Sequence, residues 1–189
     1  MDDDGTLIRR YLDGDAGAFD SLVRRHSPAL FAFLLWRMRD RHRAEDVLQD
    51  TFLRMLTHLE KYRHSGRLRA WLFSIARNLA TDAERTAGAG RLVSTESGPG
   101  EGMPTVGDLL PAPESSRPDV TAERLEAYTA ARSAVAELPA QQREVFLMRS
   151  AGLSFREIGR IQRVPLNTAL GRMHDAVTRL RKRLKTEET

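Results

Sequence analysis

The middle of this 189-residue chain constrains its fold most, because residues 87–121 cannot form a packed core. This stretch contains no aromatic residue, and 15 of its 35 residues are Gly, Pro or Ser. Such a composition buries too little apolar surface to offset the conformational entropy that is lost on ordering. We therefore expect a flexible, mildly acidic linker over residues 87–121, which separates one domain at residues 1–86 from another at residues 122–189.

Apolar residues on the N-terminal side of this linker recur at helical spacing. Two stripes between Ala44 and Arg85 repeat every three or four positions, as on the buried side of an amphipathic helix. They consist of Leu48, Phe52, Met55, Leu56 and Leu59, then of Leu72, Ile75, Ala76, Leu79 and Ala83. The alternation that is typical of a strand does not persist anywhere. The sequence predicts an all-α fold of two small helical domains.

Two further helices are expected before Ala44. The first should begin near Asp4, and the second should follow Gly14 and Asp15, whose carboxylate can cap it. Apolar side chains of the second helix supply packing surface, and most of them belong in a core: Phe19, Leu22, Val23, Leu30, Phe33 and Leu34.

The C-terminal third has the pattern of a helix-turn-helix. Ser154 and Glu157 have the spacing of a capping box, which opens a short helix through Ile158 and Ile161. Pro165 ends this helix and precedes a longer one that Asn167 or Thr168 can cap. One apolar stripe follows the longer helix: Leu170, Met173, Val177, Leu180 and Leu184. Two helices of this kind place an N-terminal helical end in the DNA major groove.

The charge distribution favours a nucleic-acid partner for the same third of the chain. The net charge is +2 over residues 1–86 (15 basic and 13 acidic), −3 over 87–122 (2 and 5) and +5 over 123–189 (13 and 8). Only Lys61, Lys182 and Lys185 are lysine. Planar guanidinium groups suit phosphates and base edges, although a GC-rich genome would produce the same arginine bias.

Several classes of protein are disfavoured. The chain has no cysteine, which excludes disulfides, thiolate zinc sites and a cysteine nucleophile. The acidic start Met1–Asp4 and the lack of a long apolar run predict neither a signal peptide nor a membrane-spanning helix, so we expect a cytoplasmic protein without membrane insertion. Scattered histidines and the lack of a glycine-rich phosphate loop predict no enzyme, no metal and no cofactor.

Seven motifs occur along the chain in a fixed order. Three lie before the linker, at Gly14–Phe19, Ala44–Phe52 and Trp71–Asn78, and four lie after it, at Leu138–Pro139, Arg143–Phe146, Leu153–Ile158 and Pro165–Thr168. The first three resemble region 2 of bacterial sigma-70 factors, and the last four resemble region 4. The order and spacing are most similar to the short extracytoplasmic-function (ECF) group.

This resemblance implies an ECF sigma factor that binds core RNA polymerase through its β′ and β subunits and directs promoter-specific transcription initiation. It also implies regulation by an anti-sigma factor. The acidic face of the helix that follows Ala44 would dock on the β′ coiled coil through Asp46, Gln49, Asp50 and Leu53. From the residues alone, such a face can equally be solvated surface.

By the same resemblance, the loop from Arg63 to Arg69 captures a flipped base of the promoter minus-ten element, and the helix from Ala70 to Arg85 follows the non-template strand. The basic residues of this loop would hold phosphates, and Tyr62 or His64 could stack on the base. The helix that follows also presents aromatic rings, including that of Phe73, on which a base could stack. Trp71 could pack in the core or serve as a platform for a nucleobase, and its family position favours packing that shapes the DNA surface. The candidate contacts are Tyr62, Arg63, His64, Arg67, Arg69, Trp71, Arg77, Asn78, Thr81 and Arg85.

Candidate readers of the minus-thirty-five element lie at the start of the last helix: Asn167, Thr168, Ala169, Gly171, Arg172 and His174. Arg172 would contact a guanine or a phosphate, and Thr168 a phosphate. This segment departs from the commonest family pattern. Arg163 stands where Gly is usual, Ala169-Leu170-Gly171 replaces Val-Lys-Ser, and Asp175 stands where Arg is frequent.

Two other functions remain open from the sequence. A helix-turn-helix transcriptional regulator would bind DNA without core polymerase, but it leaves the motifs between Ala44 and Arg85 unexplained. A protein-only adaptor would occupy polymerase without reading DNA. Duplex binding by the isolated protein separates the regulator from a sigma factor, which generally needs core polymerase.

Overall fold

A computed structural model describes residues 2–62, 66–90 and 122–187. Within these ranges all regular structure is helical, and the chain divides into two compact units, Met1–Gly100 and Glu101–Thr189. The all-α prediction is confirmed. Of the predicted linker, residues 87–90 continue helix α4, and residues 91–121 lie outside the described residues.

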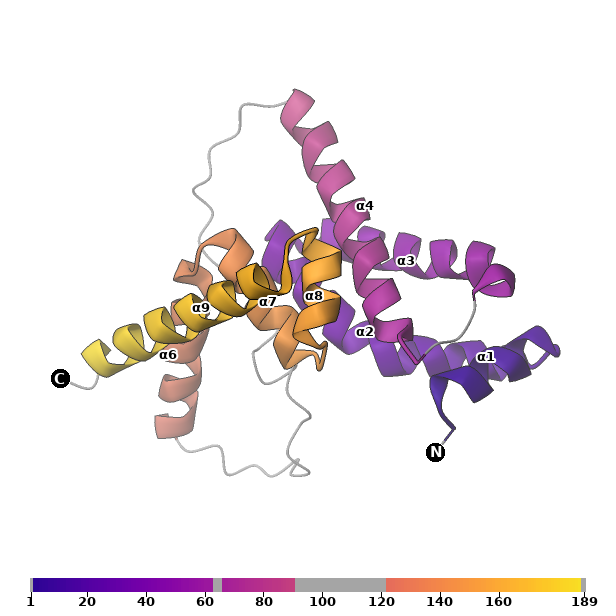
Figure 1. The fold of residues 1–189 in the computed structure, drawn as a ribbon, viewed down its shortest axis with the longest axis horizontal. Coiled ribbons are helices and arrows are strands. Elements are labelled where there is room, and N and C mark those ends of the chain that lie inside the picture. The colour runs from indigo at the N-terminus through magenta and orange to yellow at the C-terminus, as the bar shows by residue number, and fades with distance from the viewer. Residues whose placement is uncertain (1, 63–65, 91–121, 188–189) are drawn as a thin grey trace. The chain divides into compact units, whose positions relative to one another are not determined.

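The first unit contains α1 (Asp4–Leu12), α2 (Ala16–Met38), α3 (Arg41–His58), the short 3-10 turn η1 (Leu59–Lys61) and α4 (Leu68–Gly90), drawn in indigo to magenta in Figure 1. Helix α2 packs against α1, α3 and α4, and α3 also packs against α4. Because three helices surround α2, its residues 32–36 are all buried.

Aromatic rings connect the helices of this unit. The ring centroids of Phe33 in α2 and Phe73 in α4 are 5.3 Å apart. Tyr11 of α1 lies 5.4 Å from Phe19 of α2, and Phe19 meets Phe52 of α3 edge-on at 6.4 Å. Edge-on and tilted rings at these distances attract each other beyond the area that they bury. The aromatic contacts therefore fix α2 against all three neighbours.

The predicted apolar residues of this unit line its core. The buried ones are Leu22, Leu30, Phe33, Leu34, Phe52, Met55, Leu59, Leu72, Ile75 and Ala76. The half-buried ones are Phe19, Val23, Leu48, Leu56, Leu79 and Ala83.

Two aspartates precede the first two helices. Asp3 caps α1, since its carboxylate accepts a hydrogen bond from the Thr6 backbone N–H at 2.7 Å. Asp15 occupies the N-cap position of α2 as predicted, but its side chain makes no capping hydrogen bond. The predicted capping hydrogen bond is therefore not formed, and that part of the prediction was wrong. Oδ2 of the carboxylate accepts from Nε and Nη2 of Arg10, at 3.0 and 2.6 Å. These bonds lower the pKa of Asp15.

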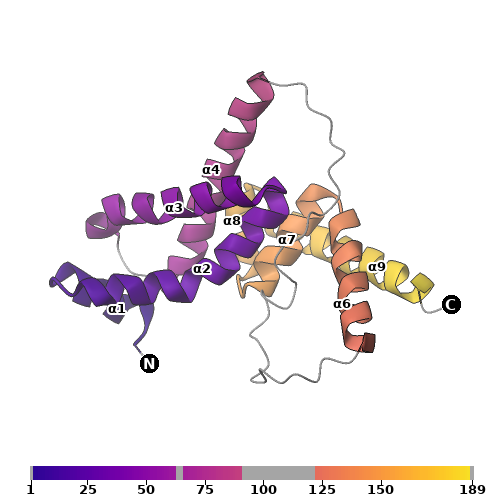
Figure 2. The same cartoon turned by 180° about the vertical axis from the view of Figure 1, so that it is seen from behind.

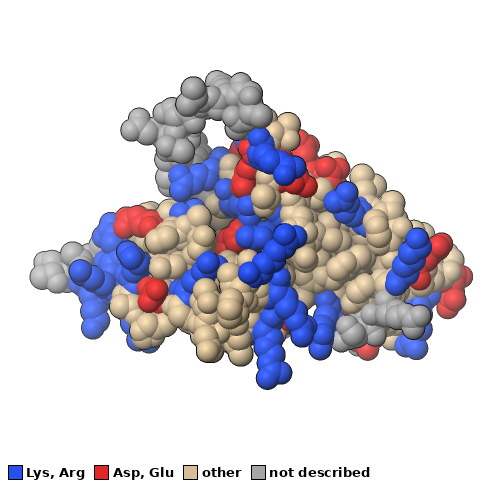
Figure 3. Space-filling model, turned by 45° about the horizontal axis from the view of Figure 1, so that its top comes forward, with Lys and Arg blue, Asp and Glu red and all other residues tan. Residues whose placement is uncertain are grey.

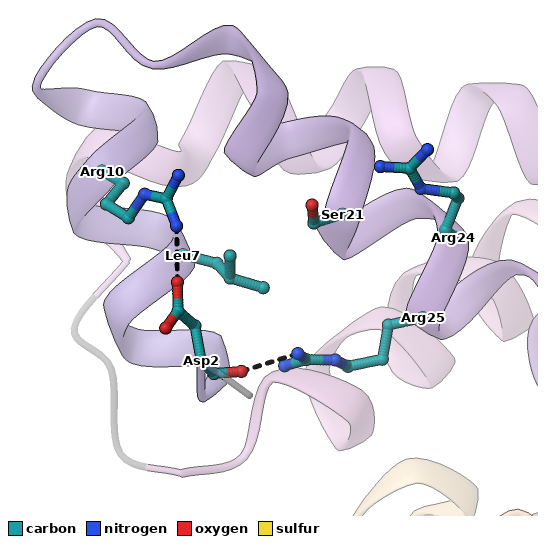
Figure 4. A pocket seen from close by; sticks show the side chains of 6 residues that line it. All are labelled: Asp2, Leu7, Arg10, Ser21, Arg24 and Arg25. Atoms are coloured by element: carbon teal, nitrogen blue, oxygen red, sulfur yellow. Dashed lines mark hydrogen bonds and ion pairs between the residues drawn. The ribbon is translucent and has the colours of Figure 1, made fainter.

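Asp2 and Asp4 hold the start of the chain against α2. Asp2 accepts from Arg10 through its carboxylate and from Arg25 through its backbone oxygen, beside an open hollow of about 380 Å³ (Figure 4). The Asp4 carboxylate accepts from Arg25 at 2.7 Å and lies 3.1 Å from Nε2 of the buried His26. Burial by itself raises the pKa of Asp4, but the hydrogen bonds from His26 and Arg25 outweigh it and lower that pKa to about 2.

The second unit contains α6 (Ala122–Glu137), α7 (Ala140–Ser150), α8 (Phe155–Gln162) and α9 (Leu166–Glu187), which Figure 2 shows from behind. Helix α9 packs against α6, α7 and α8, and α7 packs against α8. Helices α8 and α9 form the predicted helix-turn-helix. The core of the unit includes Val145, Leu147, Met148 and Ile158.

The predicted capping box opens α8. Ser154 Oγ accepts from the Glu157 N–H at 3.3 Å, and Glu157 Oε2 accepts from the Ser154 N–H at 2.8 Å. The helix ends at Arg163, which adopts the left-handed conformation with φ of 57°. This conformation costs a residue with a Cβ atom roughly 1–2 kcal/mol, which is why glycine is usual there.

The start of α9 corrects two predictions. The helix begins at Leu166, and the Pro165 carbonyl accepts from Thr168 N at 3.0 Å, so Asn167 and Thr168 lie in the first turn and do not cap it. Pro165 occupies the N-cap position, and its side chain has no hydrogen-bond acceptor to cap the helix. The predicted apolar stripe is wrong at its first member, because Leu170 is 41% exposed and the neighbouring Ala169 is fully buried. The other four members of the stripe are half-buried: Met173, Val177, Leu180 and Leu184.

Candidate nucleic-acid interface

The four candidate polymerase contacts lie along one side of α3. Asp46, Gln49, Asp50 and Leu53 are spaced by three and four positions, and all of them are exposed. Leu53 exposes 58% of its surface, the largest fraction among the large apolar side chains of the described residues. The structure therefore places two carboxylates and an amide around one exposed apolar side chain.

Tyr62, which precedes α4 in the chain, stacks on Trp71 near the start of α4. Their ring centroids are 4.7 Å apart, and the ring planes differ by 19°. Each ring thus has one face covered by the other, and both residues are half-buried. This agrees with the alternative in which Trp71 packs and shapes the surface. Phe73 is buried against Phe33 and offers no stacking face, so its inclusion among the exposed rings was wrong.

Basic side chains mark the N-terminal end of α4. Arg67 and Arg69 are exposed. Because α4 begins at Leu68, Arg69 lies in the first helical turn, whereas the prediction placed it in a loop. Arg63 and His64 lie outside the described residues. The free N–H groups of a helix N-terminus attract anions, so arginines there add to a favourable site for phosphate.

The remaining candidates on α4 are Arg77, Asn78, Thr81 and Arg85, of which Arg77 is half-buried and the others are exposed. Thr81 is already engaged, because its Oγ1 accepts from Arg37 Nη2 of α2 at 2.9 Å and donates to the Arg77 carbonyl at 2.8 Å. Arg85 Nη2 lies 3.2 Å from an Asp82 oxygen, on the surface. Asn78 has no such partner among the described residues.

Sequence reasoning missed Arg37. Besides Thr81, its guanidinium group donates to both oxygens of Glu84 in α4, at 2.9 and 2.8 Å. A second clamp joins Arg43 of α3 to the Ala83 carbonyl at 3.2 Å. Bidentate arginine–carboxylate pairs are geometrically specific, so these contacts fix α4 against α2 and α3. A separation of 47 residues leaves no local pattern that could reveal the Arg37 pair.

The candidate readers on α9 differ in exposure: four are exposed, Ala169 is buried and Arg172 is half-buried. Asn167, Thr168, Gly171 and His174 are exposed as expected. Ala169 was wrongly included, because its side chain is fully buried and cannot reach DNA.

Arg172 is half-buried and forms part of a relay across three helices. Its Nη1 donates to Gln162 Oε1 at 2.6 Å, and Gln162 Nε2 donates to Glu144 Oε2 at 3.0 Å and to the Gln141 carbonyl at 3.2 Å. Its Nε and Nη2 groups make no hydrogen bond with any described residue. Arg172, the strongest predicted reader, is therefore held in place by the buried side-chain amide of Gln162. Gln162 was missed, and its only signal was a polar residue on the inward side of α8.

The sequence analysis also did not predict a basic hollow beside the turn between α8 and α9. It measures about 410 Å³ and is lined by Arg156, Arg160 and Arg163 together with Gly159, Val164, Pro165 and Leu166. The three arginine side chains make no hydrogen bond or ion pair with a described residue. The spacing of four places Arg156 and Arg160 on one face of α8, and Arg163 directly follows the end of that helix. The face shown in Figure 3 likewise has more basic than acidic surface.

The described ranges contain neither a cluster of metal ligands nor a membrane-spanning helix. No group of three His, Cys, Asp or Glu side chains could hold a metal ion there. No helix in those ranges is long and apolar enough to cross a membrane.

Both units match models of one protein family. Residues 22–89 match the model of Sigma-70 region 2, and residues 128–180 match the model of Sigma-70 region 4. Over 94% of its length the chain is 31% identical to the RNA polymerase sigma factor CarQ of Myxococcus xanthus, of which the match covers 95%. Over 88% of its length it is 32% identical to the ECF RNA polymerase sigma factor SigL of Mycobacterium tuberculosis, of which the match covers 89%. This chain belongs to the ECF group of the sigma-70 family.

Solved structures agree with this assignment. The sigma factor is similar to RpoE of Bartonella quintana, solved in complex with the anti-sigma factor NepR, with a TM-score of 0.63 and 25% identity over 88% of this chain and 96% of the other. It is also similar to CnrH, solved in complex with the cytosolic domain of CnrY, with a TM-score of 0.65 and 25% identity over 98% and 99% of the two chains. As a sigma factor it binds core RNA polymerase and directs promoter-specific transcription initiation, which excludes the regulator that works without polymerase.

Proposed function

We propose that the sigma factor divides its work between its two units. Residues 1–86 bind core polymerase and recognise and open the minus-ten element, residues 87–121 connect the units, and residues 122–189 read the minus-thirty-five element. The observation that carries this proposal is the match of the two units to region 2 and region 4 in the family's order.

The polymerase contact is the exposed side of α3. Leu53 would be buried in the complex, and Asp46, Gln49 and Asp50 would set its orientation through charge and hydrogen bonds on the β′ coiled coil. A central apolar side chain within a polar rim is the usual anatomy of a protein interface. The exposure of all four side chains supports this assignment.

Promoter opening is assigned to the N-terminal end and the exposed side of α4. Arg67 and Arg69 would hold phosphates while the outer faces of the Tyr62–Trp71 pair receive a flipped base. Flipping costs a few kcal/mol, and stacking on an aromatic ring returns about 1–3 kcal/mol per base. Binding alone can therefore drive the step, and the protein needs no catalytic group of its own.

Arg37 acts as a positioning residue in this scheme. It ties Thr81 and Glu84 to α2, so the exposed Asn78 is presented at a fixed place along the strand. Reading of the duplex is assigned to Asn167, Thr168, Gly171 and His174 and to the free edge of Arg172, with phosphate contacts from the arginines of α8.

Two further properties follow from the same assignment. The sigma factor works in the cytoplasm, because its DNA and its polymerase are there. An anti-sigma factor regulates it by covering these surfaces, which the complex of RpoE with the anti-sigma factor NepR supports by analogy.

The test is transcription by purified bacterial core polymerase on fragmented genomic DNA from the source organism, with and without the protein, followed by mapping of new 5′ ends. New starts that share two upstream motifs are expected. Tight core binding without new starts would favour the protein-only adaptor, and the absence of core binding would contradict the assignment.

A further inference from the structure

Two exposed leucines lie at the end of α9 that approaches DNA. Leu166 is 39% exposed and Leu170 is 41% exposed, and within the described part of the second unit they are the large apolar side chains with high exposure. Four positions separate them, so they lie on the same side of the helix near its N-terminal end. Leu170 stands on the exposed line between Asn167 and His174.

The surface next to Leu170 is open. A Cβ atom added to Gly171 would meet nothing within 4 Å, so the helix surface at the next residue is open as well. The buried side of the same turn is formed by Ala169, which has no exposed surface. Leu170 is therefore directed away from the core and toward whatever binds this end of the helix.

The margin of this apolar patch is basic. Leu166 borders the hollow that Arg156, Arg160 and Arg163 line, and these three side chains make no hydrogen bond or ion pair with a described residue. A partner that satisfies the surface must carry negative charges beside an apolar group. Duplex DNA has this arrangement in its major groove, where phosphates flank the C5 methyl group of thymine.

We propose that Leu170 reads a thymine of the minus-thirty-five element by van der Waals contact with its C5 methyl group. The inference rests on the proposed function, since it requires α9 to enter the major groove. Leu170 is thereby a specificity-determining residue, although the apolar pattern of the sequence assigned it to the core. The arginines of α8 would hold the flanking phosphates without contributing to the choice of base.

The experiment replaces each thymine of the mapped minus-thirty-five element with deoxyuridine, which removes only the methyl group. Binding of the holoenzyme, assembled from core polymerase and either the wild-type protein or Leu170→Ala, is measured on both duplexes. Deoxyuridine in the spacer serves as the DNA control, and Thr178→Ala, at an exposed position further along α9, serves as the protein control.

At one thymine position, wild-type holoenzyme should bind the uracil duplex about fourfold more weakly, because a buried methyl group contributes about 0.8 kcal/mol. Leu170→Ala should bind both duplexes equally, while Thr178→Ala keeps the wild-type difference. A loss of stability in Leu170→Ala would lower the affinity for the thymine duplex and for the uracil duplex by the same factor, and the ratio of the two affinities would stay at its wild-type value. A change in this ratio therefore reports the contact with the methyl group.

Several outcomes would overturn the inference. One is an undiminished uracil penalty in Leu170→Ala. Another is no penalty in the wild type at any thymine, and a third is an element that contains no thymine. Promoter-specific transcription together with any of these outcomes would leave the proposed function intact, whereas failure to direct any transcription would remove the proposed function itself. Protection of Leu170 by a protein partner but not by promoter DNA would also contradict the inference.

Discussion

Arg172 of α9 donates a 2.6 Å hydrogen bond to the side-chain oxygen of Gln162 in α8. Gln162 is 7% exposed, and its amide nitrogen donates in turn to Glu144 and to the Gln141 carbonyl in α7. One buried amide therefore joins α7, α8 and α9, and it holds the recognition helix α9 against the other two helices. A side chain that the sequence marks as a DNA reader is thus also a structural contact.

We expect Gln162→Leu to destabilise the second unit by about 1–3 kcal/mol, because the substitution leaves part-buried polar groups without a hydrogen-bond partner. The free energy of unfolding is measured by urea denaturation of the full chain, monitored in the transition of this unit. Gln141→Ala is the control, since that side chain is exposed and its carbonyl is retained. Equal stability of Gln162→Leu and the wild type would show that the relay contributes nothing.

Arg163→Gly should raise the stability of the second unit by about 1 kcal/mol. Arg163 ends α8 with φ of 57°, a conformation that glycine adopts without steric strain. Binding to DNA should nevertheless weaken and lose part of its salt dependence, because one phosphate-binding cation is removed from the hollow. Thermal unfolding and holoenzyme binding at two salt concentrations check both parts. A variant that is less stable than the wild type would refute the strain argument.

Gly159→Ala and Gly171→Ala should have opposite effects. A Cβ atom at Gly159 would lie 3.0 Å from the Val164 carbonyl oxygen in the backbone of the turn, so the turn must move, and we expect a loss of about 1–3 kcal/mol. A Cβ atom at Gly171 meets nothing within 4 Å, so the gain in helix propensity of about 1 kcal/mol should appear in full. Urea denaturation of the two variants in parallel decides, and a stabilised Gly159→Ala would contradict the geometry.

Acid should destabilise the first unit through Asp4. Its pKa is lowered from 3.8 to about 2 by its bonds to His26 and Arg25, which prevail over burial. The folded state thus favours the ionised carboxylate, and the resulting stability is present above pH 4 and is lost as the pH falls toward 2. It amounts to about 2 kcal/mol at neutral pH.

Asp4→Asn should remove this contribution and flatten the pH dependence of unfolding between pH 4 and pH 2. Chemical denaturation of both proteins across this range measures the difference. Asp20→Asn, at an exposed position of α2, is the control and should behave as the wild type does. A variant whose stability falls with pH as steeply as that of the wild type would assign the acid sensitivity to other groups.

The double substitution Asp50→Arg with Leu53→Asp should abolish binding to core polymerase and leave the helical content unchanged. Both side chains are exposed on α3, so the change reverses a charge and removes the apolar centre without disturbing the core. A pull-down with purified core polymerase and a circular dichroism spectrum are sufficient. Arg54→Ala, an exposed substitution on the same helix, is the control, and unchanged affinity of the double variant would place the contact elsewhere.

Local patterns predicted the helices because their causes are local. The period of apolar residues defines each helix, and a capping box such as Ser154 and Glu157 needs only two residues three positions apart. The exposed side of α3 was predicted for the same reason. The family motifs added the roles of these surfaces, which periodicity does not contain.

Contacts between distant segments were not predictable in this way. Arg25 reaches Asp4 across 21 residues, and Arg37 reaches Glu84 across 47 residues. Each arginine side chain can adopt several rotamers, and the sequence offers several carboxylates with which it could pair. Only packing of the helices decides which partner lies at hydrogen-bond distance, because these bonds depend on placement to within a fraction of an ångström.

The amino-acid sequence by itself determined the all-α class, the helix-turn-helix and the resemblance to ECF sigma factors, because these depend on spacing along the chain. The tertiary structure decided which side of α9 faces the core. Ala169 and Leu170 are both compatible with an inward position, and neighbours on a helix differ by only about 100° in direction. Ala169 and Ala176, both fully buried, face the core of the unit, and the larger Leu170 is therefore turned outward. Packing of the helices, which no periodicity encodes, thus determined that Leu170 is the exposed side chain.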